Sequence, residues 1–316
     1  MKSVYFALLG AAHQAASHAT FQQLWVDGVD MGSQCARLPL SNNPVTNVGG
    51  ADIRCNVGGA SGVGAKCPVK AGGVVTVEMH QQNGDRSCNN EAIGGAHYGP
   101  VMAYLSAVDD AATADGSSDW FKVYQNSWSP TGGVGDNDNW GVKDMNACCG
   151  RVDVPIPADL PSGDYLLRAE VVALHTQPAQ LYMTCYQLTI EGSEGGTLPT
   201  GVKFPGAYSG SDPGLTANIH AQLTDYQAPG PDVIPGGTEV EAGSGCSGGC
   251  EKTCAVGESP TTSLEPVAMP TGAAGGGASC TVAKYGQCGG QGYTGCTNCE
   301  EGSTCDTTNQ YYNQCV

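Results

Sequence analysis

Short runs of β-type residues recur between residues 18 and 228, and clusters of glycine, asparagine, aspartate and proline separate them. Within this region no long stretch carries apolar residues at the spacing of a helix. The clearest β-type runs are 74–80, 101–105, 120–124, 165–172 and 181–190. This pattern predicts an all-β domain, specifically an immunoglobulin- or fibronectin-like antiparallel β-sandwich with long loops.

The first 17 residues have the composition of a secretory signal peptide. Lys2 gives a basic start, residues 4–12 are mostly apolar, and the small residues 15–17 suit a signal peptidase. Cleavage after Ser17 would make His18 the first residue of the mature chain. An N-terminal histidine offers both its α-amine and its ring Nδ1, and such nitrogen donors suit copper.

Charge and cysteine content narrow the class of protein. The chain has 316 residues, 16 cysteines and a net charge of −17, which becomes −18 when Lys2 leaves with the signal peptide. Such acidity argues against nucleic acid or an anionic membrane as a partner. No later apolar run reaches the roughly 20 residues that a membrane span needs. We therefore expect a secreted, extracellular, disulfide-bonded monomer.

The composition changes at about residue 229. From there to residue 279 glycine, proline, serine, threonine, alanine and glutamate dominate, which is typical of a linker. Cys246, Cys250 and Cys254 interrupt this segment. Three cysteines alone argue against a structural zinc site, which usually has four ligands. Disulfides are therefore expected, including one back to the sandwich.

Residues 280–316 form a second, very small unit with six cysteines. So short a segment cannot depend on a hydrophobic core and needs disulfides. Its strings 285–290, 292–295 and 309–315 resemble the fungal family 1 carbohydrate-binding module, a cellulose-binding module. An unrelated cystine-knot domain with structural tyrosines is the alternative.

The resemblance to this module implies a flat binding face for crystalline cellulose. Tyrosine rings suit such a face because they combine an apolar surface with a polar rim. The implied stacking residues are Tyr285, Tyr311 and Tyr312, with Gln287, Asn309 and Gln314 as polar neighbours. The implied disulfides are Cys288–Cys305 and Cys299–Cys315, with Cys280–Cys296 as a third.

The larger domain also resembles a known family. Its strings include 41–46, 52–56, 97–101, 152–157, 163–168 and 204–208, in an order and spacing that cover nearly all of residues 18–228. Together with His18 they resemble the fungal lytic polysaccharide monooxygenases of auxiliary activity family nine, formerly glycoside hydrolase family 61.

This second resemblance implies a copper centre. His18, through its amine and its ring, and His97 would hold one copper ion (Cu2+/Cu+) in a T-shaped histidine brace, with Tyr182 as a weak axial neighbour. His175 and Gln180 would hydrogen-bond oxygen species from outside the ligand set. Gln180 and Tyr182 are two residues apart and so share one face of a strand.

Other residues take roles from the same resemblance. Cys55–Cys185 would be the family disulfide, and Tyr208 would be a surface tyrosine that stacks on glucan. Large aromatic residues elsewhere are expected in the core or in loop packing, namely Phe21, Trp25, Trp120, Trp128 and Trp140. The pairing of eight cysteines stays open: Cys35, Cys67, Cys88, Cys148, Cys149, Cys246, Cys250 and Cys254.

The implied activity is the oxidative cleavage of β-1,4-glucan chains of cellulose. Hydrogen would be removed at carbon 1 and/or carbon 4, with a reductant and with dioxygen or hydrogen peroxide. The segment 85–95 resembles members that oxidise carbon 1. The implied electron donor is cellobiose dehydrogenase or a small phenol.

Three alternatives remain at this point. A glycoside hydrolase would need two carboxylates across a cleft, and no hydrolase pair stands out among the acids. A secreted protein could bind copper without redox turnover. A non-catalytic module could loosen cellulose. The acids considered for hydrolysis are Asp27, Asp52, Glu78, Glu91, Asp153, Asp164 and Glu170.

Overall fold

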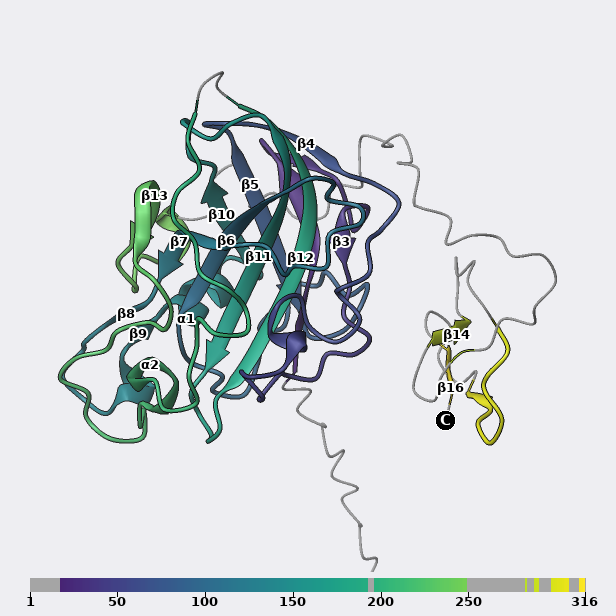
Figure 1. The fold of residues 1–316 in the computed structure, drawn as a ribbon. Coiled ribbons are helices and arrows are strands. Elements are labelled where there is room, and N and C mark those ends of the chain that lie inside the picture. Colours follow the sequence, from purple (N-terminus) through teal and green to yellow (C-terminus); the bar gives the residue numbers. More distant parts are fainter. Residues whose placement is uncertain are drawn as a thin grey trace, which may run out of the picture.

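The computed structural model describes residues 18–192, 196–248, 282, 287–289, 297–306 and 313–315. Two β-sheets pack against each other within residues 18–248 (Figure 1). The predicted β-sandwich with long loops is confirmed. None of the helices in the described ranges is long and apolar enough to span a membrane.

The smaller sheet has the strand order β10-β5-β1-β2, and all of its pairs are antiparallel. Its outer strand β10 (Arg151–Pro155) pairs with β5 (Val74–His80). The strand β1 (Thr20–Val26) lies between β5 and the short β2 (Val29–Asp30). Because β5 pairs with β1 from Thr20 onward, the start of the domain is held in the sheet.

The larger sheet has the order β13-β7-β6-β11-β12-β3, and β4 also pairs with β12. Its central pairs are antiparallel, but β4 and β13 pair in parallel with their neighbours. These two strands follow long connections, whereas a hairpin would impose antiparallel pairing. The strands are β3 (Ala36–Arg37), β4 (Cys67–Lys70), β6 (Val101–Val108), β7 (Phe121–Asn126), β11 (Gly163–Ala173), β12 (Gln180–Glu191) and β13 (Val233–Val240).

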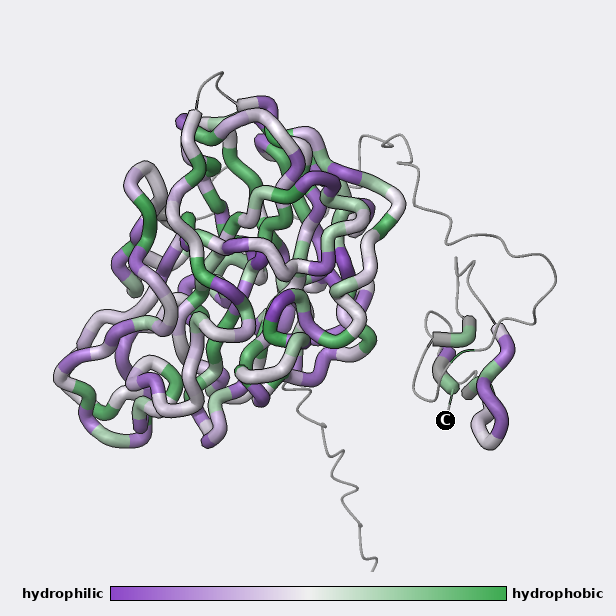
Figure 2. Tube along the Cα trace, in the orientation of Figure 1, coloured by the Kyte–Doolittle hydropathy of each residue, from purple (hydrophilic) through white to green (hydrophobic). Residues whose placement is uncertain are grey.

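The larger sheet is buried on both faces. Along β12, Tyr182 and Tyr186 belong to the core between the sheets, whereas Leu181 and Met183 belong to a second core under the long loops. Figure 2 shows the corresponding apolar colouring along the strands. Burial on both faces explains why these strands read as nearly continuous apolar runs.

The long loops contain short elements. They are β8 (Trp128–Ser129), β9 (Asn139–Trp140), α1 (Gly141–Ala147), α2 (Pro213–Thr216) and three 3-10 turns, η1 (Ala51–Ile53), η2 (Gly135–Asn137) and η3 (Gly245–Gly248). The large aromatics behave largely as expected, since Phe21, Trp25, Trp120 and Trp140 are buried. Trp128 is half-buried, and its Nε1–H donates to Asp138 Oδ2 at 2.9 Å.

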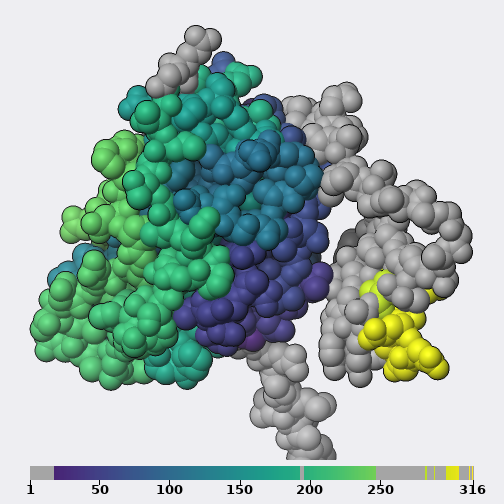
Figure 3. All heavy atoms as spheres, in the orientation of Figure 1, coloured from purple at the N-terminus to yellow at the C-terminus, as the bar shows by residue number. Residues whose placement is uncertain are grey.

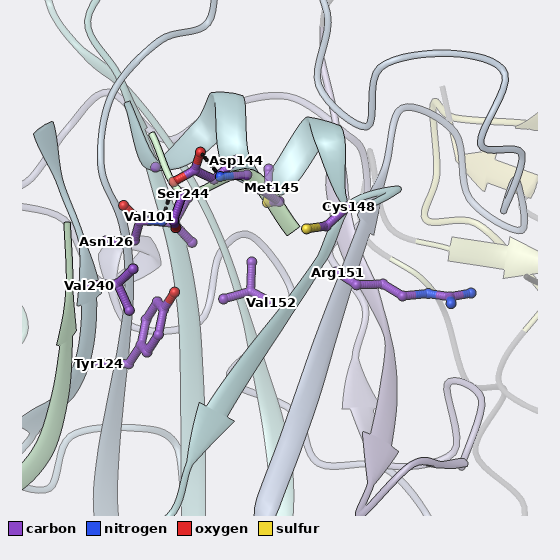
Figure 4. Close-up of a pocket in the computed structure, with 12 residues that line it drawn as sticks. Val101, Tyr124, Asn126, Asp144, Met145, Cys148, Arg151, Val152, Val240 and Ser244 are labelled. Atoms are coloured by element: carbon purple, nitrogen blue, oxygen red, sulfur yellow. Dashed lines mark hydrogen bonds between the residues drawn. The ribbon is translucent and has the colours of Figure 1, made fainter. Parts of the chain in front are cut away.

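The predicted start of the linker is corrected by the structure. Residues 233–240 form β13, which pairs with β7 at the edge of the larger sheet. The Asp144 carboxylate of α1 then accepts the backbone N–H groups of Gly243 and Gly245 at 3.0 and 2.9 Å. Figure 4 shows Asp144 beside Ser244, the residue between these two glycines. In Figure 3 this green segment, which ends at residue 248, lies along one side of the sandwich. The composition predicted a linker here because the glycines and the proline of β13 are not typical of a strand, and its partner β7 is distant in sequence.

Two consecutive residues at the end of α1 each form a disulfide. Cys148 bonds to Cys246, and Cys149 bonds to Cys88. The first joins the C-terminal segment to the sandwich, as expected for one of the cysteines in that segment. The second holds the loop that leads to His97. A further disulfide, Cys35–Cys67, joins the loop regions around β3 and β4.

The small cysteine-rich unit contains a three-stranded sheet. Its strands are β14 (Gln287–Gly289), β15 (Cys305–Asp306) and β16 (Asn313–Cys315), in the order β14-β16-β15. The structure contains the Cys288–Cys305 and Cys299–Cys315 disulfides. Some predictions concern residues outside the described ranges, namely residues 1–17, Tyr285, Asn309, Tyr311, Tyr312, Cys250, Cys254 and the pair Cys280–Cys296.

Candidate metal centre

His18 lies two residues before the start of β1 and is half-buried. The register of β1 against β5 places Thr20 opposite His80, so the first strand is anchored two residues after His18. Across the core, β1 also contacts β12, the strand of Gln180 and Tyr182. Strand pairing and sheet packing therefore bring the start of the domain close to β12 of the larger sheet.

His97 lies in the loop before β6, and its side chain is only 3% exposed. The loop reaches this position through Gly99, where a Cβ atom would approach the Val172 carbonyl oxygen to 1.7 Å. Only glycine permits so close an approach. The Leu174 N–H donates to the Tyr98 carbonyl at 2.9 Å, which holds the loop beside the end of β11.

Four rings meet at this end of the sandwich. The His18 and His97 ring centroids are 6.3 Å apart with an interplanar angle of 89°. The Tyr182 ring lies 6.2 Å from His18 and 5.7 Å from His97. The His175 ring is closer still, at 4.1 Å from His97. Residues from three distant segments of the chain thus share one site.

Three buried ring nitrogens of this cluster lack hydrogen-bond partners. Both ring nitrogens of His97 and the Nδ1 atom of His175 are buried and make no hydrogen bond. An unpartnered buried polar group is costly, about 1–3 kcal/mol. A metal ion bound by the imidazoles would remove that cost, and imidazole nitrogen is a donor that suits copper. The residues present therefore fit such an ion.

The protonation state of the rings also fits a metal. Burial lowers the pKa of the His97 ring to about 4, and the neighbouring His175 ring adds to this shift. The backbone of Gly94 and Gly95 opposes the shift, although no hydrogen bond of good geometry reaches the ring. Burial likewise lowers the pKa of His175. Both imidazoles are neutral at neutral pH, the form that binds metals.

Tyr182 and Gln180 interact as neighbours on one face of β12. The Tyr182 hydroxyl donates to Gln180 Oε1 at 2.7 Å. Burial raises the pKa of Tyr182 well above its usual range, so the phenol keeps its proton. Because the Gln180 oxygen is occupied by this contact, its NH₂ group remains the donor available to other partners.

The expectation that Tyr208 is a surface tyrosine is corrected. Its side chain is 4% exposed, and its hydroxyl donates to Glu170 Oε2 at 2.5 Å. The Tyr104 hydroxyl lies 2.8 Å from the same oxygen of Tyr208. Phe204 packs against the Tyr208 ring at 5.0 Å between centroids. A ring enclosed in this way cannot stack on a polysaccharide.

Three of the acids considered for hydrolysis are engaged in structural ion pairs. Glu170 pairs with Arg168 at 2.6 Å, and both side chains are fully buried. Glu78 pairs with Arg86 at 2.7 Å, and Asp164 pairs with Lys66 at 2.6 Å. Each of these carboxylates therefore has a cationic partner, whereas a hydrolase requires one carboxyl group with a raised pKa facing a second.

One residue beside the site was not expected from the sequence. The ring of His220 contacts the backbone of His175 and the side chain of Asp136. Nothing in the local string 216–222 distinguishes this histidine from an ordinary surface residue. Only the fold, which brings residue 220 next to η2 and to the residue 175 backbone, reveals the contact.

Comparison with known proteins decides the family. Residues 18–227 match the family model described as Auxiliary Activity family 9 (formerly GH61). The chain belongs to this family. Its members are lytic polysaccharide monooxygenases, so this family 9 protein is an oxidoreductase that cleaves polysaccharide oxidatively. Residues 284–312 match the fungal cellulose binding domain.

Relatives of this family 9 protein share its whole length. An "AA9 family lytic polysaccharide monooxygenase B" from Podospora anserina is 60% identical over 330 residues, covering all of both chains. A protein of the same description from Thermothelomyces thermophilus is 62% identical over 326 residues, also covering all of both chains. Fungal proteins of this family are extracellular enzymes.

Solved structures agree with the fold of the family 9 domain. The structure titled HiLPMO9B is 32% identical, with a TM-score of 0.60, and the match covers 69% of this chain and all of that one. The structure titled CvAA9A is 28% identical, with a TM-score of 0.63, covering 70% of this chain and all of that one.

Proposed function

We propose that this protein is a secreted, copper-dependent monooxygenase that cleaves the β-1,4-glucan chains of cellulose at carbon 1 and/or carbon 4. The observation that carries the proposal is the cluster of His18, His97 and Tyr182 with its unpartnered buried nitrogens, in a chain that belongs to family 9. The donor set of two histidines and a tyrosine suits copper better than the oxygen-preferring metals.

His18 and His97 are the proposed ligands. The His18 ring would bind together with its α-amine, which becomes free if the signal peptide is removed after Ser17. His97 would bind through one of its two unpartnered nitrogens. The phenol of Tyr182 stays protonated and would be a weak neighbour, not an anionic ligand. One copper ion held there would supply one-electron redox chemistry with dioxygen or hydrogen peroxide.

His175 and Gln180 are proposed to act on the oxidant rather than on the metal. The His175 ring lies against His97 and is neutral at neutral pH, so one of its nitrogens carries a hydrogen that can be donated. The Gln180 NH₂ group is a second donor, since its oxygen is held by the Tyr182 hydroxyl. Two donors fixed beside one site can hold an oxygen species in one orientation.

Cellulose is the proposed substrate because the chain carries a match to the fungal cellulose binding domain. Tyr285, Tyr311 and Tyr312 would stack on the glucan surface, and Asn309 would add polar contacts. Gln287 and Gln314 are opposite each other in the β14–β16 register, a placement compatible with one binding face. A reductant is required, and we propose a small phenol or cellobiose dehydrogenase.

Product analysis tests this function. The processed protein is loaded with one equivalent of copper and incubated with cellulose and ascorbate, with a no-reductant control and a His97→Ala variant. Mass spectrometry should find reductant-dependent aldonic acids or 4-keto sugars with the parent protein only. Native sugars alone would indicate a hydrolase, and no soluble product would indicate a non-catalytic, copper-binding cellulose module.

A further inference from the structure

Two histidines, His80 and His220, have no role in the proposed copper centre. His80 is buried, and its Nε2 lies 2.9 Å from Glu78 Oε1. The side chain of His220 is 58% exposed, yet both of its ring nitrogens are engaged. Its Nδ1 lies 2.8 Å from Asp136 Oδ2, and its Nε2 lies 3.0 Å from the His175 carbonyl oxygen.

The chemistry of the two partners determines the charge of the His220 ring. An ionised carboxylate and a backbone carbonyl can only accept hydrogen bonds. Both ring nitrogens must therefore donate, and only the imidazolium form has hydrogen on both. The pKa of His220 is raised, first by the hydrogen bond to Asp136 and then by that to the His175 carbonyl. The hydrogen-bond partners and the direction of the pKa shift both indicate that the His220 ring is protonated and positively charged.

The charged groups around His220 come from two other elements. Asp136 belongs to η2 and supplies the carboxylate. Lys143 of α1 donates from Nζ to the carbonyl oxygens of Asp136 and Asp138 at 2.7 and 2.6 Å. The backbone N–H of His220 donates to Asn218 Oδ1 at 3.1 Å. Asp136 thus accepts from both cationic residues, from His220 through its carboxylate and from Lys143 through its backbone carbonyl.

These contacts belong to a closed circuit that passes through the residues next to His97 and His175. The Lys143 ammonium also lies over the Tyr98 ring, 4.3 Å from its centroid, and Tyr98 is the residue after His97. The Leu174 N–H, from the residue before His175, donates to the Tyr98 carbonyl. In this circuit, His220 makes the contact that reaches His175 itself.

We propose that His220 is a positioning residue for His175, bridging the Asp136 carboxylate and the His175 carbonyl as an imidazolium. The bridge fixes the backbone of His175 and thereby the position of its ring beside His97. A neutral His220 can donate from only one nitrogen, so it must release one of its two partners. The role in catalysis rests on the proposed function, whereas the bridge itself does not require copper.

The bridge is tested first in the copper-free protein by ¹⁵N NMR of its histidines over pH. We expect the two His220 ring nitrogens to titrate together with a midpoint above the usual 6.5. Asp136→Asn should lower that midpoint. Asp119→Asn is the matched control, because Asp119 is an exposed carboxylate paired with Lys203. A midpoint at 6.5 that Asp136→Asn does not change would overturn the bridge.

The positioning role is tested in the copper-loaded protein. His220→Ala should change the electron paramagnetic resonance spectrum of bound Cu2+ and lower kcat on soluble cello-oligosaccharides about 10-fold, with copper affinity retained. His220→Gln, whose amide can restore one of the two bonds, should recover part of the loss. An unchanged spectrum and unchanged kcat would refute positioning. If the parent protein yields no oxidised sugar, the proposed function fails, while the NMR titration still decides the bridge.

Discussion

Arg86 and Glu78 form a two-pronged ion pair that joins the loop after β5 to the strand itself. Arg86 Nε and Nη2 donate to the two Glu78 carboxylate oxygens at 2.8 and 2.7 Å. The guanidinium also lies over the Trp25 ring at 5.2 Å, and its Nη1 bonds to Asp30. The loop held in this way continues to His97, so the pair connects a buried charge cluster to the proposed copper centre.

Loss of this pair should destabilise the domain. Arg86→Ala leaves the fully buried Glu78 carboxylate without its main cation, and we expect a loss of about 3 kcal/mol or more in the free energy of unfolding. Chemical denaturation measures the change. Lys203→Ala is the control, because that lysine and Asp119 are both exposed and their pair is worth less than about 1 kcal/mol. Equal effects of the two variants would contradict this reading.

The Glu78 carboxylate should also make the free energy of unfolding depend on pH. Burial alone would raise the pKa of Glu78, but hydrogen bonds from His80 and Arg86 outweigh it and hold this pKa far below its usual range. A lowered pKa in the folded state stabilises the protein above the unfolded value of 4.5, and this contribution is lost as pH falls below it. Thermal unfolding at pH 7, 5 and 3 should show a decline that is shallower in Glu78→Gln.

One extra residue before His18 should abolish tight copper binding. Such a residue converts the α-amine to an amide, which removes one proposed ligand while leaving both rings in place. We expect copper affinity to fall by about 100-fold or more, since even residues outside the ligand set are worth 10–100-fold. Titration calorimetry compares the extended and processed forms. Equal affinities would exclude the N-terminal amine as a ligand.

Tyr208→Phe should affect stability and not adsorption. The variant removes the hydroxyl that donates to the buried Glu170 carboxylate, and we expect a loss of about 1–3 kcal/mol in unfolding free energy. Binding to cellulose should stay unchanged, because the ring is enclosed. Weaker adsorption at unchanged stability would instead indicate that Tyr208 contacts the substrate.

Removal of residues 280–316 should weaken adsorption to cellulose. The catalytic domain would lose the second binding site that raises its local concentration on the polymer, an effect of about 10²–10⁴-fold in avidity for tethered sites. Turnover at high substrate loading should be spared. Depletion assays with crystalline cellulose measure the adsorption, and unchanged binding would show that the module is dispensable.

Local pattern predicted those parts of the fold whose burial is regular along the chain. The run 181–190 is a strand because both faces of β12 are covered, which fills it with apolar residues. The strand β13 escaped this reasoning, since its two glycines and its proline carry no pattern and its pairing with β7 is set by distant contacts. A local sequence pattern does not reveal contacts with residues that are distant in the chain.

The residues of the proposed site could likewise be predicted only in part from the sequence. The grouping of His18, His97, His175 and Tyr182 followed from resemblance to a family and not from spacing, because three separate segments supply it. Tyr208 misled because its environment is decided by Glu170, which lies 38 residues earlier on β11. His220 was overlooked for the same reason, since Asp136 and His175 reach it only through the fold.

The Cys148–Cys246 disulfide has a mechanical consequence for a tethered enzyme. Tension that arrives through the chain beyond residue 248 meets this covalent bond before it meets β13. The load therefore passes into the end of α1 and through Cys149 to Cys88, and the hydrogen bonds between β13 and β7 are shielded from peeling. A protein pulled along a solid polymer by its module can thus keep its edge strand in register.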